Sequence, residues 1–131
     1  MRLCSNVLAQ QVVQTSLGGT QSVDELLLPG GRIYEQREFI YKAMNGIPGI
    51  SAVKPKAAFY IFPKIDTAMY NIHDDEQFVL DFLKQEKVML VHGRGFNWKD
   101  PDHFRIVYMP RVDELAQIQE KMTRFLSKYR Q

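Results

Sequence analysis

Residues 88–129, VMLVHGRGFNWKDPDHFRIVYMPRVDELAQIQEKMTRFLSKY, contain two short apolar runs, a polar loop between them and a long amphipathic segment after them. The apolar runs 88–91 and 104–109 have the length of β-strands, and the first is predicted to be buried. The segment 111–129 carries apolar side chains at helical spacing, at Val112, Leu115, Ile118, Met122, Phe125, Leu126 and Tyr129. The stretch therefore predicts strand, loop, strand and helix.

The residues before this stretch extend the same alternation of helices and short strands. The predicted elements are helix 7–17, helix 31–46, strand 50–54, strand 57–62 and helix 75–87. Strand 57–62 is apolar on both faces, which predicts an interior strand. Helices interleaved with short strands are typical of a small sheet covered by helices. The fold class is therefore α/β, in the two-layer α+β sense, with a mixed or antiparallel sheet.

Composition excludes several classes of protein. Of the 131 residues, 45% are hydrophobic and 24% are charged, so a packed core is expected and general disorder is not. The formal net charge of +2 is spread over the chain, which argues against nucleic-acid binding. His73, His92 and His103 lie in separate segments without metal-ligand spacing, so no metal site is expected.

The single cysteine and the hydropathy pattern bear on the cellular setting. Cys4 is the only cysteine, so no intrachain disulfide can form, and an inert thiol in a reducing cytoplasm is expected. Mixed polar residues follow Met1, so no signal peptide is expected, and no apolar run reaches the length of a membrane span.

Arg105 is the residue that most needs an explanation. Strand alternation places Phe104, Ile106 and Tyr108 on one face and Arg105 with Val107 on the other. A guanidinium among apolar neighbours needs a partner, because an unpaired buried charge costs several kcal/mol. One interpretation is a structural ion pair with Asp100, Asp102 or a helix carboxylate. The other is a fork that binds a ligand carboxylate through two hydrogen bonds.

Seven stretches of the chain, taken in order and with their spacing, resemble the C-terminal end of the class I/II aminotransferases of pyridoxal phosphate (PLP) fold type I. They are residues 17–22 (LGGTQS), 28–37 (LPGGRIYEQR), 54–63 (KPKAAFYIFP), 71–75 (NIHDD), 79–88 (VLDFLKQEKV), 93–98 (GRGFNW) and 102–107 (DHFRIV). The resemblance covers residues 1–131 and is greatest to the bacterial alanine aminotransferase-like branch. It implies two parts: residues 1–48 as helices of the large domain and the interdomain helix, and residues 49–131 as the C-terminal small αβ domain.

The resemblance also implies roles for individual residues. It assigns Arg105 to binding the α-carboxylate of the substrate. It places Phe59 at a position that lines the active site, and Gly93 and Gly95 as backbone that forms part of its wall. Arg94 departs from the pattern, because close relatives often carry a small residue there, and this puts the shape of the pocket in doubt.

The family's catalytic lysine is missing from this chain. Family members hold PLP as a Schiff base on a lysine in a Ser-x-x-Lys setting, which precedes the region covered here. Ser51-Ala-Val-Lys54 fits the bare pattern, but Pro55 follows it and we interpret the match as chance. No catalytic residue is therefore expected here, nor bound PLP, although the intact enzyme is expected to use PLP.

For the intact protein, the resemblance implies transamination between an amino acid, alanine in the nearest branch, and a 2-oxo acid such as 2-oxoglutarate. The intact enzyme is expected to be a cytoplasmic homodimer without nucleic-acid or membrane partners, and this chain alone is expected to be inactive. A stand-alone carboxylate-binding module is the alternative, as is an interaction module in which residues 1–48 dock a partner.

Overall fold

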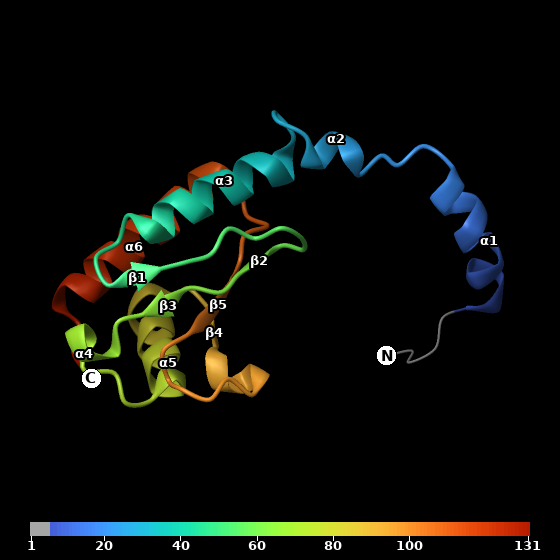
Figure 1. The fold of residues 1–131 in the computed structure, drawn as a ribbon. Helices are drawn as coiled ribbons and strands as arrows, with labels where there is room; N and C mark the ends of the chain where they lie inside the picture. Colours follow the sequence, from blue (N-terminus) through green and yellow to red (C-terminus); the bar gives the residue numbers. More distant parts are fainter. Residues whose placement is uncertain (1–5) are drawn as a thin grey trace.

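A computed structural model describes residues 6–131 of the chain (Figure 1). Cys4 lies outside the described residues, so its environment stays a prediction. The elements are α1 (Val7–Gly18), α2 (Asp24–Leu27), α3 (Arg32–Asn45), β1 (Ile50–Ser51), β2 (Tyr60–Ile61), β3 (Lys64–Ile65), α4 (Thr67–Tyr70), α5 (Asp75–Glu86), β4 (Val91–His92), the 3-10 helix η1 (Gly93–Phe96), β5 (Phe104–Val107) and α6 (Val112–Lys128).

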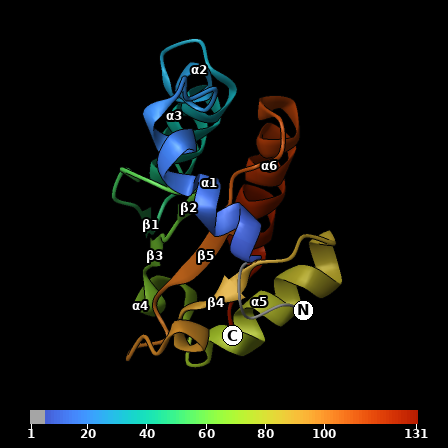
Figure 2. The same ribbon diagram turned by 90° about the vertical axis from the view of Figure 1, so that its right-hand side faces the viewer.

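Helices α3, α5 and α6 cover one side of a small antiparallel sheet. Helix α3 packs against α6, and α5 contacts both α6 and β4 (Figures 1 and 2). The side chains between these layers are almost completely buried: Ile40, Met44, Phe82, Phe104, Leu115 and Met122. The α+β architecture with an antiparallel sheet confirms the predicted fold class.

The strands form two small sheets. One pairs β1 with β3, and the other has the order β2-β5-β4 with antiparallel neighbours throughout. Strand β5, which carries Arg105, is therefore the central strand of its sheet. The prediction that residues 57–62 form an interior strand is wrong, because β2 lies at the sheet edge. The left-handed backbone of Ala58, with φ of 59°, also leaves only Tyr60–Ile61 in strand conformation.

The predicted helices match those observed to within two residues at either end, and the strands agree less well. Asn6 and Asp74 accept backbone N–H groups at the starts of α1 and α5 and are the N-caps of these helices. The prediction that residues 88–91 form a buried strand is wrong, because β4 begins at Val91 and the side chain of Met89 is 78% exposed. Short strands depend on tertiary pairing, whereas helices are fixed by local hydrogen bonds and caps.

Helix α1 stands apart from the packed layers. None of its residues is buried, and Leu8 and Leu17 are more than 70% exposed. In Figure 1 it lies beyond α2, away from the sheet, and in Figure 2 it lies in front of β4 and β5. Helix α3, by contrast, contributes Ile40 and Met44 to the core.

Candidate functional site

Arg105 lies on the face of the sheet that the helices leave open. Along β5 the side chains of Phe104 and Ile106 are buried against the helices, whereas Arg105 is half-buried and Val107 is 42% exposed. The predicted alternation is therefore confirmed. A pleated strand with one face in the core presents its alternate side chains to the other face, so Arg105 points away from the core.

Two aromatic rings enclose the guanidinium of Arg105. Its Cζ lies 4.6 Å from the ring centroid of Tyr60 and 4.2 Å from that of Phe96. Tyr60 pairs with Val107, two residues beyond Arg105, so cross-strand neighbours on one face bring the first ring into contact. Phe96 arrives from η1. Such stacking holds the planar group by cation–π attraction while its edge stays available for hydrogen bonds.

No carboxylate within residues 6–131 forms an ion pair with Arg105, and its Nε is buried without a hydrogen-bond partner. The ion-pair interpretation with Asp102 is therefore wrong. The carboxylate of Asp102 accepts hydrogen bonds from the Trp98 Nε1 at 2.8 Å and pairs with Lys64 at 3.1 Å. Burial opposes ionisation of Asp102, but these contacts and the one from His103 lower its pKa.

Gly93 and Gly95 lie in the tight loop between β4 and β5. A Cβ on Gly93 would stand 2.7 Å from the backbone oxygen of His103, and one on Gly95 would stand 2.9 Å from the His92 Nε2. Both glycines thus allow the loop to pack closely on its flanking strands. This close packing brings the loop, with Phe96 at its end, next to Arg105.

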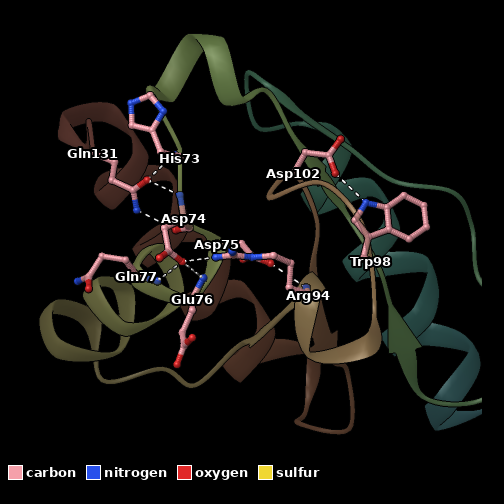
Figure 3. A network of polar contacts seen from close by, with 9 residues as sticks. All are labelled: His73, Asp74, Asp75, Glu76, Gln77, Arg94, Trp98, Asp102 and Gln131. Atoms are coloured by element: carbon pink, nitrogen blue, oxygen red, sulfur yellow. Dashed lines mark hydrogen bonds and ion pairs between the residues drawn. The ribbon is translucent and has the colours of Figure 1, made fainter.

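Arg94 points toward the beginning of α5 (Figure 3). Its backbone N–H donates to Asp75 Oδ2 at 2.8 Å, its Nε donates to Asp75 Oδ1, and its Nη2 lies 2.5 Å from Asp74 Oδ1. The Asp75 side chain is only 2% exposed. Burial opposes its ionisation, but the hydrogen bonds from Arg94 outweigh that effect and lower the Asp75 pKa below its ordinary value of 3.8.

We expect Asp75→Asn to lower the free energy of unfolding by about 1.5–3 kcal/mol at pH 7, because a charge-assisted contact is lost. A carboxyl with a depressed folded pKa stabilises the protein above its unfolded value and loses that contribution as pH falls through the folded value. The difference between wild type and variant should therefore shrink below pH 3.8. Urea unfolding between pH 7 and pH 3 measures it.

Asp113→Asn is the matched control for this experiment, because the Asp113 carboxylate is 70% exposed in its ion pair with Arg111. We expect it to change stability by less than about 0.5 kcal/mol at every pH. An equal loss of stability for the Asp75 variant at pH 7 and pH 3 would contradict the assignment.

Phe59 lies beside this site, and no ring contact or hydrogen bond joins its side chain to Arg105. Its ring meets Tyr60 edge-on at 6.4 Å, and its side chain is 40% exposed. It lines a pocket of about 290 Å³ together with Leu27, Arg37 and Tyr108. The structure thus brings Arg105 and the glycine loop together. Phe59 is next in the chain to Tyr60, whose ring contacts Arg105.

Tyr60 and Phe96 were missed by sequence reasoning as neighbours of Arg105. Strand register could have identified Tyr60, since residues diagonal across a strand pair lie within reach of aromatic side chains. No comparable signal exists for Phe96, because a loop conformation brings it there.

Within residues 6–131, the side chains and helices bear on two further classes of site, a metal centre and a membrane span. No three His, Asp or Glu side chains gather as ligands for a metal ion. No helix there combines the length and apolar character that crossing a bilayer requires.

The chain is similar in sequence to known aminotransferases. It is 59% identical over 131 residues to glutamate-pyruvate aminotransferase AlaA of Escherichia coli and 51% identical to an alanine aminotransferase of Mycobacterium tuberculosis. All of the chain is covered, but it spans only 32% and 30% of those proteins. No protein-family model matches the chain.

Solved structures give the same result. An aminotransferase from Escherichia coli matches all of the chain with a TM-score of 0.91 and 59% identity, and 32% of that protein is covered. An alanine aminotransferase from Pyrococcus furiosus matches 96% of the chain with a TM-score of 0.81 and 37% identity, and 31% of that protein is covered.

These matches favour the aminotransferase hypothesis over a stand-alone binding or interaction module. They are high in identity, they extend over the described fold, including α1, and they fall in the C-terminal third of the relatives. The chain belongs to the fold type I aminotransferases, in the alanine aminotransferase-like branch, and corresponds to the C-terminal third of its relatives.

Proposed function

We propose that this chain supplies the carboxylate-binding part of a PLP-dependent aminotransferase, with Arg105 binding the α-carboxylate of the substrate. The observation that carries the proposal is a guanidinium held between two rings, on an open face, with no carboxylate partner in residues 6–131. Because a planar guanidinium matches a carboxylate through two parallel hydrogen bonds, an amino acid or 2-oxo acid fits this group. Alanine and 2-oxoglutarate are the proposed pair.

We also propose that the residues of this chain do not make a PLP site by themselves. A lysine that carries the cofactor needs a neutral amine in a desolvated setting. Lys54, in the Ser-x-x-Lys match, instead pairs with Glu38 at 2.6 Å, and its side chain is 45% exposed. We therefore place the cofactor-binding lysine outside this chain. PLP acts as an electron sink where it is bound, and the contribution of this chain is to orient the substrate.

The proposal extends to domain organisation and partners. Residues 1–48 are assigned to the large domain and the interdomain helix, and residues 49–131 to the small domain. The exposed α1 and the core contribution of α3 support a helical connection of this kind. The intact enzyme is proposed to be a homodimer, and the single cysteine, Cys4, supports a cytoplasmic setting.

A hybrid enzyme tests the proposal directly. In it, the 131 residues replace the matched C-terminal third of the Escherichia coli enzyme AlaA. We expect the hybrid to transaminate alanine and 2-oxoglutarate within about tenfold of the parent kcat/KM, because the chain shares its fold with an aminotransferase of the same organism at a TM-score of 0.91. A folded, dimeric hybrid that binds PLP but has no activity would contradict the proposal.

The isolated chain is the complementary experiment. Mixed with PLP and alanine, it should show no transamination and no absorbance from lysine-bound cofactor. Borohydride reduction followed by mass spectrometry checks this result. A specific PLP adduct on one lysine would overturn the conclusion that the cofactor-binding lysine lies elsewhere.

A further inference from the structure

The loop between β4 and β5 is fastened to the start of α5 by Arg94. Three donors of this residue reach two adjacent carboxylates: the backbone N–H and Nε bind Asp75, and Nη2 binds Asp74 (Figure 3). Asp74 is also the N-cap of α5, since its Oδ1 accepts the backbone N–H groups of Glu76 and Gln77. Arg94 therefore connects the loop to a helix terminus that is itself fixed.

Burial makes this connection hard to break. The Asp75 side chain is 2% exposed, and a buried carboxylate without its cation is strongly disfavoured. Asp75 receives both the backbone N–H and the Nε of the same residue, so the position of the Arg94 main chain is fixed as well as that of its side chain. An ordinary surface ion pair, which involves side chains alone, places no such constraint on a loop.

Phe96 lies two residues beyond Arg94 and is the last residue of η1. The turn is closed by the Asn97 N–H donating to the Arg94 oxygen at 3.0 Å, and Asn97 ends it in the left-handed region at φ 59°. The ring of Phe96 then lies 4.2 Å from the guanidinium of Arg105 and meets Phe62 edge-on at 6.3 Å. Fixing Arg94 consequently fixes the ring that covers Arg105.

We propose that Arg94 is a positioning residue for the carboxylate-binding guanidinium: its attachment to Asp75 and Asp74 holds Phe96 on Arg105. Held between Phe96 and Tyr60, the Arg105 side chain is ordered before a ligand arrives, so less rotamer freedom is lost on binding. The role of the bound carboxylate rests on the proposed function of Arg105. The contact between the loop and Arg105 is independent of that proposed function.

Side-chain NMR of the full 131-residue chain tests the proposal. Protons above an aromatic face are shifted upfield, so the Arg105 Nε–H should resonate upfield of an unstacked arginine, and its signal is assigned by its loss in Arg105→Lys. In Arg94→Ala this signal should move downfield, and half-saturation with L-alanine or propionate should need about 2- to 10-fold more ligand.

Arg124→Ala is the matched control. Arg124 pairs with Glu86 at the other end of α5, and their side chains are 58% and 11% exposed. This variant also removes an arginine–carboxylate pair from α5, but far along the helix from the loop, so the Arg105 signal and ligand binding should stay unchanged. A shift of equal size in both variants would mean that α5 is merely destabilised, which would overturn the proposal.

Two more variants keep the outcomes separable. Phe96→Ala should reproduce the Arg94→Ala shift, and Phe96→Tyr should preserve the wild-type signal because the ring face is kept. If Arg94→Ala fails to fold, Arg94→Lys replaces it, since lysine keeps the charge but loses the fork. Both variants keep the backbone N–H, so the experiment tests the side-chain contacts of Arg94. An unchanged Arg105 signal in a folded Arg94 variant overturns the proposal. Absence of carboxylate binding in the wild type counts against the proposed function alone.

Discussion

Replacing Arg105 by glutamine in the hybrid enzyme is expected to lower kcat/KM for alanine by about 30- to 4,000-fold. Truncating one partner of a buried, hydrogen-bonded charge pair costs about 2–5 kcal/mol, and each 1.4 kcal/mol is a factor of ten. In this fold the loss should be large because Arg105 has no carboxylate partner of its own in residues 6–131. Within these residues, no ion pair with an internal carboxylate has to break before Arg105 binds a ligand.

Two comparisons separate carboxylate binding from a general loss of structure. Arg105→Lys keeps the charge and loses the fork, so its activity should lie between wild type and Arg105→Gln. Propionate, which has the carboxylate and lacks the amino group, should inhibit the parent hybrid competitively and should not inhibit the glutamine variant. Arg124→Gln, which breaks the ion pair with Glu86 at the far end of α5, should leave kcat/KM within about twofold. Full activity of a folded Arg105→Gln hybrid would remove the basis of the proposed function.

Phe82→Ala is expected to lower the free energy of unfolding by about 3–5 kcal/mol, because a large side chain is removed from a packed core. Phe82 is completely buried in α5, and its ring meets Phe125 of α6 edge-on at 5.1 Å. The resulting cavity would lie between the two helices beneath the sheet. Since the free energy of unfolding of a native protein is about 5–15 kcal/mol, this substitution should remove a large part of it.

Urea unfolding followed by circular dichroism measures the effect of Phe82→Ala. Leu80→Ala is its control, because Leu80 is on the same helix and 39% exposed, and its loss should cost about 1 kcal/mol or less. Similar costs for the two substitutions would mean that the α5–α6 contact contributes little to the stability of the domain.

Much of the secondary structure follows from the sequence because helices are specified locally. The periodic apolar positions of 111–129 predicted α6 closely, and the predicted helices 7–17 and 75–87 agree with α1 and α5 to within one residue at either end. The strands were harder, since a segment of two paired residues has little signal of its own. Strand 57–62 was predicted as interior, yet it is shortened by the backbone of Ala58 and lies at an edge.

The sequence by itself determined that Arg105 needs a partner, because its strand alternates and its neighbours are apolar, and it determined the family through the order of its motifs. Only the tertiary structure decided which groups meet the guanidinium. Tyr60 and Phe96 are 45 and 9 residues away in the chain, and strand register and a loop turn bring them to Arg105. The tertiary structure also brings the Arg94 side chain to Asp75. A buried carboxylate without a cation is strongly disfavoured, and Arg94 supplies that cation.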